Sequence, residues 1–412
     1  MNPGNMQNYI GVHRVHRMKT ISLFETDRRT LKDSIELTIA SLVAYANKYQ
    51  HWAIAFSGGK DSSAMVTLVA HLIETNQIPT PKSLTVIYAD TRMELPPLQI
   101  SAIRIMDNMK IKGIDCRIVL PDLDKRFFVY MLGRGVPPPS NTFRWCTGQI
   151  KIEPMQKFLR RLRDIYGEKF LMLTGVRIGE SAVRDQKIAL SCGRNGAECG
   201  QGWFQETTSK QVADTLAPLL HWRVCHVWDW LMFNAPALGF PTSTIALAYG
   251  GEEAQEINAR TGCVGCNLAS RDVALDQILK LDDWQYLRPF KRLKPLYAEL
   301  KLARNRLRKD GTERRKDGTM VKNPMRLGPL TFDARHYGLE QILSIQSEIN
   351  AFADGTRRPF VSLINTEEKE RIEELITLQT WPQGWIGDEV TGDVMLPEVL
   401  GEGIVQEWLF TD

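Results

Sequence analysis

Residues 52–69 decide the fold, and they read WAIAFSGGKDSSAMVTLV. The apolar run Trp52 to Phe56 has the length of a buried strand, and a helical apolar pattern over Ser62 to Glu74 follows it. The loop Ser57 to Ser63 holds two adjacent glycines, which permit backbone angles that point successive N–H groups into one concavity. Because a helix start adds the positive end of its dipole, this strand, loop and helix predict a site for an anion such as phosphate.

Side chains of the same loop supply further groups for that anion. Lys60 adds a full positive charge, and the hydroxyls of Ser57, Ser62 and Ser63 are donors for phosphate oxygens. The loop is not a Walker A loop, because the glycines of the Gly58-Gly59 pair are adjacent instead of being separated by four residues. We therefore expect nucleotide chemistry of a different kind from that of Walker A enzymes.

Outward from this loop, short β-branched runs alternate with helix-length amphipathic stretches, which is typical of a parallel sheet covered on both faces. Further strands are predicted at Leu84 to Ala89, Cys116 to Leu120 and Phe170 to Thr174. Helices are predicted at Pro97 to Met109 and Glu153 to Tyr166. The fold class is therefore α/β, a doubly wound parallel sheet, in which ligands bind beyond the carboxyl ends of the strands.

Composition and length agree with this class. The chain has 412 residues, 43% of them hydrophobic, and its apolar runs are far shorter than the roughly 20 residues of a membrane helix. Its first residues are basic and polar and lack the apolar core of a secretory signal, so a cytoplasmic protein without membrane contact is expected. A net charge of +4 is too small to diagnose nucleic-acid binding by itself.

Changes of character along the chain predict three parts. These are an N-terminal segment, residues 1–45, a nucleotide and cysteine domain, residues 46–290, and a smaller C-terminal module, residues 291–412. Within the last part, Lys301 to Arg326 contains ten basic and three acidic residues. Such a stretch suits contact with nucleic-acid phosphates, and a solvated hairpin explains it nearly as well. In the middle part, the Trp-rich segment Leu219 to Phe233 is most simply a buried face.

Two other strand ends carry candidate binding residues. Asp90 and Glu94 follow the second strand, and either carboxylate is suited to hold Mg²⁺ or to contact a ribose. After the fourth strand, Gly175 and Arg177 begin a short motif in which the Arg177 guanidinium is a candidate anion clamp. Farther along this motif, Glu180 and Arg184 are as well explained by a structural ion pair with each other as by a role in binding.

The cysteine pattern points to metal or sulfur chemistry. Seven cysteines in an expected reducing compartment argue against a disulfide framework. The pair Cys263 and Cys266 has the two-residue spacing of a metal site. Candidates for the remaining ligands lie upstream at Cys146, Cys192 and Cys199. One possibility is an iron–sulfur cluster bound by Cys146, Cys263, Cys266 and either Cys192 or Cys199. The alternative is zinc bound by Cys192, Cys199, Cys263 and Cys266.

Two cysteines lie outside that set. Cys116 falls in a predicted strand and Cys225 in the Trp-rich segment, so both are expected to be buried small residues.

The Ser57 to Ser62 loop after a first strand resembles the PP-loop of ATP pyrophosphatases, whose fold is that of the adenine nucleotide alpha hydrolases. The resemblance implies that ATP binds there and releases pyrophosphate, with Lys60, Asp61 and Arg177 as catalytic residues. The segment Thr174 to Ser181 resembles the phosphoadenylyl-sulfate reductase branch. Around Cys146 the chain is similar to the segment where sulfonucleotide reductases bind a four-iron cluster, although threonine replaces the second cysteine of their pair.

Over residues 45–350 the chain is most similar to the ATP-pyrophosphatase component of bacterial DNA phosphorothioation systems, of Dnd or Ssp type. The resemblance rests on the Asp90 to Pro96 pattern, the Cys146-Thr147 segment and the stretch Arg326 to Thr331. It implies DNA as the acceptor, a cysteine desulfurase as sulfur donor and other DNA-modification subunits as partners. Two alternatives remain: a sulfonucleotide reductase, disfavoured because no cysteine follows Cys266, and an ATP-sensing subunit without turnover.

Overall fold

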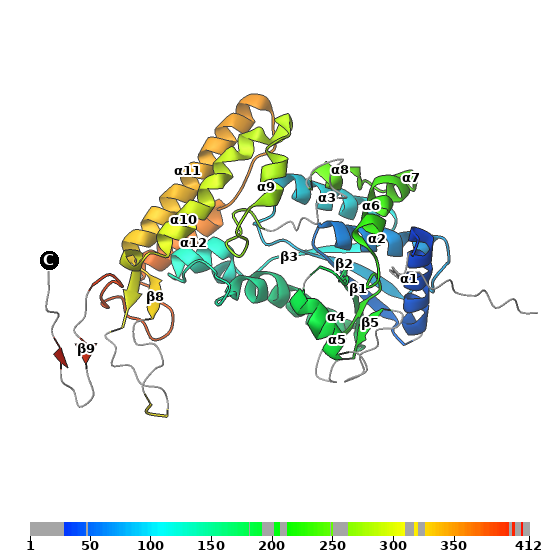
Figure 1. Ribbon diagram of the computed structural model, residues 1–412, viewed down its shortest axis with the longest axis horizontal. Coiled ribbons are helices and arrows are strands. Elements are labelled where there is room, and N and C mark those ends of the chain that lie inside the picture. The colour runs from blue at the N-terminus through cyan, green and yellow to red at the C-terminus, as the bar shows by residue number, and fades with distance from the viewer. Residues whose placement is uncertain are drawn as a thin grey trace, which may run out of the picture.

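The computed structural model describes most of the chain, and its centre is a six-stranded sheet with helices on both faces (Figure 1). The described residues are 29–46, 48–180, 182–191, 202–206, 212–247, 249, 263–309, 317–319, 326–394, 398–399 and 405–406.

The sheet has the strand order β3-β2-β1-β4-β6-β5. Its strands are β1 (His51–Phe56), β2 (Ser83–Ala89), β3 (Asp115–Val119), β4 (Phe170–Leu173), β5 (Trp203–Gln205) and β6 (Ala213–Ala217). Neighbouring strands are parallel except β5, which runs antiparallel to β6 at the edge. The chain winds outward from β1 to β3 and then returns to place β4 on the other side of β1. This reversal confirms the doubly wound α/β class and puts the topological switch point between β1 and β4.

Alternate residues of the strands face two different cores. Trp52, Ile54 and Phe56 point into the large core beside α2 (Lys60–Glu74) and α3 (Pro96–Ile111), whereas Ala53 and Phe170 point into a smaller core. Helix α4 (Glu153–Tyr166) covers the smaller core with Leu159 and Leu162. Strands buried on both faces are expected for a parallel sheet, and the predicted helices agree with α2, α3 and α4 to within two residues.

The helix α1 (Leu31–Ala46) belongs to the nucleotide domain, although it falls in the part predicted as a separate N-terminal segment. Its Leu42 and Tyr45 are buried, and the Tyr45 ring stacks on Phe204 of β5 at 4.2 Å. Trp222 donates a hydrogen bond from Nε1 to the Thr38 hydroxyl at 2.9 Å. These contacts tie the helix to the edge of the sheet.

The Trp-rich segment forms a run of short helices that packs on α2. It comprises α6 (Val224–Asp229) and most of the π-helix η4 (Trp230–Asn234), and the short helices α7 (Ala235–Ala237) and α8 (Ser243–Leu247) follow it. Leu219, Trp222 and Trp228 are buried as expected. The prediction for Cys225 was wrong, because its side chain is exposed on the outer side of α6, and Cys116 is only half-buried.

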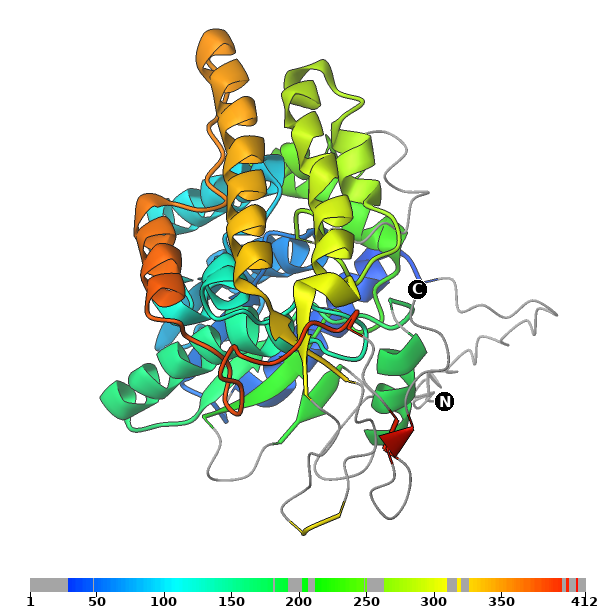
Figure 2. The ribbon, with the colours of Figure 1, turned by 90° about the vertical axis from the view of Figure 1, so that its left-hand side faces the viewer.

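The C-terminal helices form a bundle beside the sheet domain, seen from two sides in Figures 1 and 2. They are the 3-10 helix η6 (Asp282–Arg292), α10 (Leu293–Leu300), α11 (Phe332–Thr356) and α12 (Thr366–Thr377). Helix η6 runs across the predicted boundary at residue 290 and continues directly into α10. Helix α12 packs against the π-helix η2 (Val129–Gly133), so the bundle is joined to the sheet domain through this segment.

Local sequence explains where these helices begin. Thr331 accepts a hydrogen bond from Ala334 N–H at the start of α11, and Asn365 with Glu368 forms a capping box at α12. The remaining short elements are η1 (Leu123–Lys125), η3 (Thr147–Ile152), α5 (Ala182–Ser191), α9 (Val273–Ile278), η7 (Ala303–Asn305), β7 (Arg306–Arg308), β8 (Leu327–Leu330), β9 (Glu398–Val399) and β10 (Val405–Gln406).

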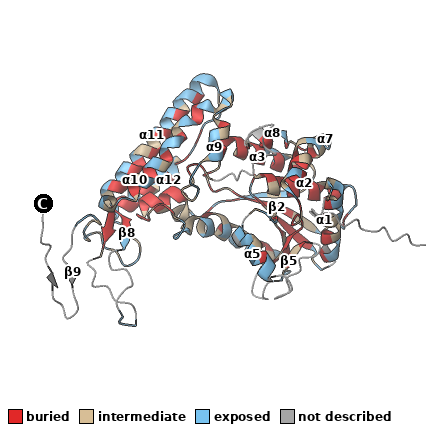
Figure 3. Cartoon of the chain, viewed as in Figure 1, coloured by how far each residue is buried: buried red, intermediate tan, exposed pale blue. Residues whose placement is uncertain are grey.

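Burial follows the layers of the fold, with the sheet and the inner sides of the helices buried and the outer sides of α10 and α11 exposed (Figure 3). None of the helices in the described part of the chain combines the length and apolar character that a membrane span requires.

Candidate active site

A cavity of about 390 Å³ lies beyond the carboxyl ends of β1 and β4, at the switch point of the sheet. Its described lining comes from the loop after β1, the start of α2, the loop after β4 and one distant tyrosine. The lining residues are Ala55, Ser57, Gly59, Lys60, Asp61, Ser62, Gly175, Glu180, Arg184 and Tyr249. Most of the loop that the sequence singled out therefore faces one cavity, where ligands of such sheets bind.

The loop after β1 is fixed by its own hydroxyls and by glycine. The Ser62 hydroxyl donates to the Gly59 carbonyl at 3.0 Å and accepts from the Ser57 N–H at 3.2 Å. Gly58 has a φ of +71°, and a Cβ there would lie 2.9 Å from the Ala102 Cβ in α3. Gly58 therefore lets the loop turn and pack closely against α3. Neither Gly58 nor the fully buried Ser63 lines the cavity.

Three charged side chains form a chain of ion pairs at the cavity wall. The Asp61 carboxylate accepts from Arg177 Nε at 2.5 Å and lies 3.0 Å from Lys60 Nζ. Burial by itself would raise the pKa of Asp61, but the two cations outweigh burial and bring it below its usual value. The three predicted catalytic residues thus lie together, with the carboxylate ionised and both cations held in place.

Arg177 is held from both sides. Its side chain is 4% exposed, and Nη1 donates to the Trp222 carbonyl at 3.1 Å. Gly175, just before it, packs so tightly that an added Cβ would lie 3.0 Å from the Asp61 carbonyl carbon and from the Ser62 nitrogen. A glycine at this position lets the loop after β4 approach the start of α2.

Glu180 and Arg184 form the ion pair that the sequence allowed, with Arg184 Nη1 2.8 Å from Glu180 Oε2, and both also line the cavity. Burial, together with the neighbouring Asp61 carboxylate, raises the pKa of Glu180. The cavity therefore contains one carboxyl group with a lowered pKa and one with a raised pKa, an arrangement often found at functional sites.

Tyr249 is a cavity residue that the sequence did not predict. Its hydroxyl accepts from the Lys60 N–H at 3.1 Å, and its ring lies 5.4 Å from Lys60 Nζ. The residue is 189 positions away in the sequence, so only the tertiary fold brings it to the loop. No motif around Tyr249 could have indicated this contact.

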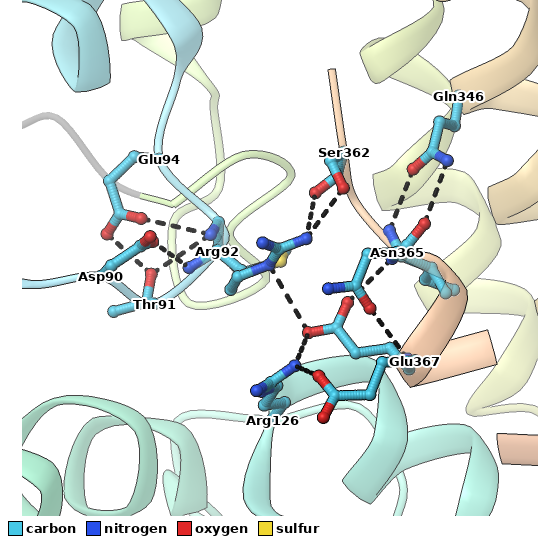
Figure 4. A network of polar contacts seen from close by, with 12 residues as sticks. Asp90, Thr91, Arg92, Glu94, Arg126, Gln346, Ser362, Asn365 and Glu367 are labelled. Atoms are coloured by element: carbon cyan, nitrogen blue, oxygen red, sulfur yellow. Dashed lines mark hydrogen bonds and ion pairs between the residues drawn. The ribbon is translucent and has the colours of Figure 1, made fainter. Parts of the chain in front are cut away.

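Asp90 and Glu94, predicted to bind Mg²⁺ or ribose, do not line this cavity. Asp90 accepts from the Arg92 N–H at 2.8 Å, and Glu94 accepts from the Thr91 hydroxyl at 2.7 Å, as Figure 4 shows. Burial raises the pKa of Glu94. These carboxylates lie one strand away from the switch point, and their hydrogen bonds to Thr91 and Arg92 stabilise the turn after β2.

The same turn joins the C-terminal bundle. Arg92 has a φ of +63°, and its side chain donates to the Ser362 hydroxyl at 2.8 Å and lies 3.5 Å from Glu368 of α12 (Figure 4). Glu368 also accepts from Arg126 Nη1 at 3.3 Å. The left-handed backbone at Arg92 turns its side chain outward, so the turn after β2 contacts the bundle.

Three cysteines lie near one another on the far side of that turn. The Cys263-to-Cys266 loop is anchored by the Val264 N–H, which donates to the Met93 carbonyl at 2.6 Å. Burial raises the pKa of the Cys146 and Cys263 thiols, and the Lys151 ammonium acts on both in the opposite direction. These groups are thus close enough to influence one another electrostatically.

The predicted metal set is not assembled in the described part of the chain. No group of three or more histidine, cysteine, aspartate or glutamate side chains among the described residues is arranged to hold a metal ion. Cys146, Cys263 and Cys266 influence the same Lys151 side chain electrostatically. Cys192 and Cys199 lie outside the described residues.

The described part of the basic stretch, Lys301 to Lys309, contacts the protein itself. Lys301 Nζ donates to the Pro139 carbonyl at 3.1 Å, and Lys309 pairs with Glu389 at 2.5 Å. The side chains of Arg306 and Arg308 are buried and donate to backbone carbonyls. This part of the stretch therefore gives no support to DNA contact, and residues 310–316 and 320–325 lie outside the described residues.

Comparison with known proteins gives one family and two relatives. Residues 51–236 match the family model described as the phosphoadenosine phosphosulfate reductase domain. Two uncharacterised proteins of Methanocaldococcus jannaschii are 27% and 28% identical over 216 and 179 residues, which is 50% and 43% of this chain. The chain spans only 44% and 31% of the length of these relatives.

Two solved structures are similar at low scores. Phosphoadenylyl-sulfate reductase from Candida auris, in a phosphate complex, is 13% identical, with a TM-score of 0.31 over 51% of this chain and 93% of that one. The U34-tRNA thiolase NcsA from Methanococcus maripaludis, with its [4Fe-4S] cluster, is 16% identical and has a TM-score of 0.33. The match covers 66% of this chain and 82% of that one. The closer resemblance to DNA phosphorothioation proteins is not confirmed by these comparisons. The part of the chain that matches the phosphoadenosine phosphosulfate reductase domain, residues 51–236, carries the sheet and most of the cavity.

Proposed function

We propose that this protein is a nucleotide-using sulfur-transfer enzyme that binds ATP in the cavity between β1 and β4 and releases pyrophosphate. The observation that carries the proposal is the convergence of Lys60, Asp61 and Arg177 beside the loop after β1. A phosphate chain placed there would meet the loop hydroxyls and the Lys60 ammonium at a switch point, and Arg177 would act through its contact with Asp61.

Each side chain has a separate task in this proposal. Asp61 holds the side chains of Lys60 and Arg177 in place, because all three are largely buried and paired. The cations then stabilise negative charge that develops on the phosphates, which is the main way proteins catalyse phosphoryl and nucleotidyl transfer. The Ser57 hydroxyl lines the cavity and orients the phosphate oxygens.

The sulfur side of the reaction is assigned to the cysteine neighbourhood around Lys151. A [4Fe-4S] cluster and Mg²⁺ remain part of the proposal, supported by the resemblance of the Cys146 segment and the Asp90 to Pro96 pattern to sulfur-transfer enzymes. Among the described residues, no three histidine, cysteine, aspartate or glutamate side chains are grouped to hold a metal ion. Zinc is the competing metal.

The acceptor is proposed to be a phosphate oxygen of DNA, with sulfur delivered by a cysteine desulfurase and with other DNA-modification subunits as partners. This finer assignment is supported by the motif resemblance over residues 45–350. A cytoplasmic location is proposed with it, since the sulfur chemistry needs reduced thiols.

Pyrophosphate release tests the proposal. The anaerobically purified protein is incubated with ATP, Mg²⁺, a cysteine desulfurase with cysteine, and DNA, and pyrophosphate is measured. We expect release that is lost in Lys60→Ala and Asp61→Asn and kept in Arg161→Gln, a change on the exposed side of α4. Tight ATP binding without pyrophosphate would instead identify an ATP-sensing subunit, and no ATP binding would contradict both.

Reduction of a sulfonucleotide is the second candidate, and the match of residues 51–236 to the phosphoadenosine phosphosulfate reductase domain favours it. Release of sulfite from a sulfonucleotide in the presence of a thiol donor would support this candidate. Pyrophosphate release from ATP without sulfite would exclude it.

A further inference from the structure

Two tyrosine hydroxyls near the Cys263-to-Cys266 loop are buried without a hydrogen-bond partner. Tyr88 of β2 and Tyr297 of α10 are each 1% exposed, and neither hydroxyl has a partner within the described part of the chain. Burying a hydroxyl without a partner costs free energy, so most such groups in native proteins are paired. Two of them near one loop therefore indicate a group that the hydroxyls bind.

Packing places Tyr297 beside this loop, on the side of the bundle. Gly265 has a φ of +62°, and a Cβ there would lie 2.7 Å from the Leu293 Cβ at the start of α10. Tyr297 comes four residues after Leu293, so the two side chains lie on the same face of the helix. Its ring also lies 6.1 Å from the Phe127 ring, which stacks on Trp145. Tyr297 is thus close to both cysteine-bearing segments, since Trp145 directly precedes the upstream cysteine.

Tyr88 approaches the same cysteines from the sheet. A Cβ on Gly58 would lie 3.7 Å from Tyr88 Cε2, so the ring lies against the loop after β1. Burial raises the pKa of Tyr88, and the neighbouring Glu94, Asp90 and Cys263 raise it further. The ring of Tyr88 therefore contacts the loop of the first cavity, while its hydroxyl is within electrostatic range of Cys263.

The hydroxyls do not bind the thiols themselves. Burial raises the pKa of Tyr297 well above its usual value, and Cys263 and Cys266 raise it further. Among the described residues, however, no hydrogen bond joins either tyrosine hydroxyl to a thiol. Both cysteines are only half-buried, so part of each remains accessible to a sulfur donor. Lys151 is within electrostatic range of both thiols and supplies positive charge. An anionic atom bound to these cysteines would therefore meet two O–H donors and a cation.

We propose that Tyr88 and Tyr297 donate hydrogen bonds to an anionic sulfur atom carried by the Cys263-to-Cys266 loop. The inference rests on the proposed function, since it concerns the sulfur side of that reaction. Two sources share this chemistry, namely the inorganic sulfide of an iron–sulfur cluster and the terminal sulfur of a cysteine persulfide. With either source, the phenol O–H groups stabilise negative charge on sulfur and keep their own protons.

The midpoint potential of the cluster in the anaerobically purified full chain tests the first source. Hydrogen bonds to cluster sulfurs favour the more negative, reduced form, so Tyr88→Phe and Tyr297→Phe should each lower this potential. The content of iron and acid-labile sulfide should stay at the wild-type level. Tyr286→Phe is the matched control, because its buried hydroxyl donates to the Pro359 carbonyl at 2.9 Å, and it should leave the potential unchanged.

Release of sulfur to cyanide tests the second source. Protein that contains no iron is loaded by a cysteine desulfurase with cysteine, and cyanide then removes the terminal sulfur as thiocyanate. We expect release about tenfold faster in Tyr88→Phe and Tyr297→Phe than in wild type, because a hydrogen bond to a charged sulfur is lost. Tyr286→Phe should release sulfur at the wild-type rate. Neither Tyr88→Phe nor Tyr297→Phe removes a hydrogen bond found in the described part of the protein, so both should keep the urea midpoint of the unloaded wild type.

The two readouts also define what would overturn the inference. Wild-type values in either tyrosine variant would overturn the assignment of that hydroxyl, and equal changes in Tyr286→Phe would overturn both assignments. A wild type that retains neither a cluster nor persulfide sulfur would do the same. Pyrophosphate release is measured on the same preparations. Its absence, with sulfur binding still dependent on the tyrosines, would count against the proposed ATP chemistry alone.

Discussion

The guanidinium of Arg177 lies 2.5 Å from the carboxylate of Asp61, and this contact links the loop after β4 to the loop after β1. Both side chains are largely buried, with exposed fractions of 4% and 15%. Removing one partner of such a pair leaves an uncompensated buried charge. We therefore expect Asp61→Asn to lower the free energy of unfolding by about 3 kcal/mol, measured by urea denaturation.

The Arg184–Glu180 pair provides the matched control, because Arg184 is 43% exposed. Arg184→Gln should change the free energy of unfolding by less than about 1 kcal/mol. Equal losses of unfolding free energy in the two variants would show that the buried Arg177–Asp61 pair contributes no more to stability than the exposed Arg184–Glu180 pair.

The lowered pKa of Asp61 predicts how this stabilisation depends on pH. The folded state binds the proton of this carboxyl more weakly than the unfolded state, so the contribution is present above the unfolded value, 3.8, and is lost as pH falls through the lower folded value. The difference in unfolding free energy between wild type and Asp61→Asn should therefore shrink on acidification below about pH 4. A difference that stays constant or grows towards low pH would contradict the assignment.

How far the sequence predicts this molecule depends on how local each feature is. The first four strands and their helices follow from apolar periodicity, whereas β6 (Ala213–Ala217) was missed because Asp214 and Thr215 interrupt its short apolar run. The loop after β1 was predicted because strand, glycines and helix start are contiguous.

Features of the site that depend on tertiary structure could not be predicted in the same way. Tyr249 reaches the loop from 189 residues away. Asp90 was expected beside the phosphates because it follows a strand, but only the strand order places β2 away from the switch point. The backbone at Arg92 then directs that turn towards α12.

Gly175 offers a test of the cavity that leaves every charge in place. An alanine Cβ there would lie 3.0 Å from the Asp61 carbonyl carbon and the Ser62 nitrogen, so the loop after β4 and the start of α2 must separate. Because overpacking costs about 1–3 kcal/mol, we expect Gly175→Ala to weaken binding of an ATP analogue by about tenfold. Gly355→Ala in α11, where nothing lies within 4 Å, should bind the analogue as wild type does.

Glu368 tests the junction between the turn after β2 and the bundle. Its side chain is 3% exposed and lies against both Arg92 and Arg126, whereas the neighbouring Glu367 is 59% exposed and pairs with Arg126. Glu368→Gln keeps the shape of the side chain but removes its charge, and should cost about 2 kcal/mol of unfolding free energy. Glu367→Gln should cost less than about 1 kcal/mol, and the reverse order of the two losses would refute the junction.

The cysteines test whether the protein carries a metal centre. Anaerobically purified protein is expected to contain iron and acid-labile sulfide, and Cys146→Ser and Cys263→Ser should each lose both, because thiolates hold such clusters. Cys225→Ser changes an exposed cysteine on α6 and should retain the iron of the wild type. Zinc in place of iron would identify the competing structural site. Absence of any metal in the wild type would contradict the metal centre. A cysteine that serves only as a sulfur carrier would, when replaced, lower turnover and leave the metal content unchanged.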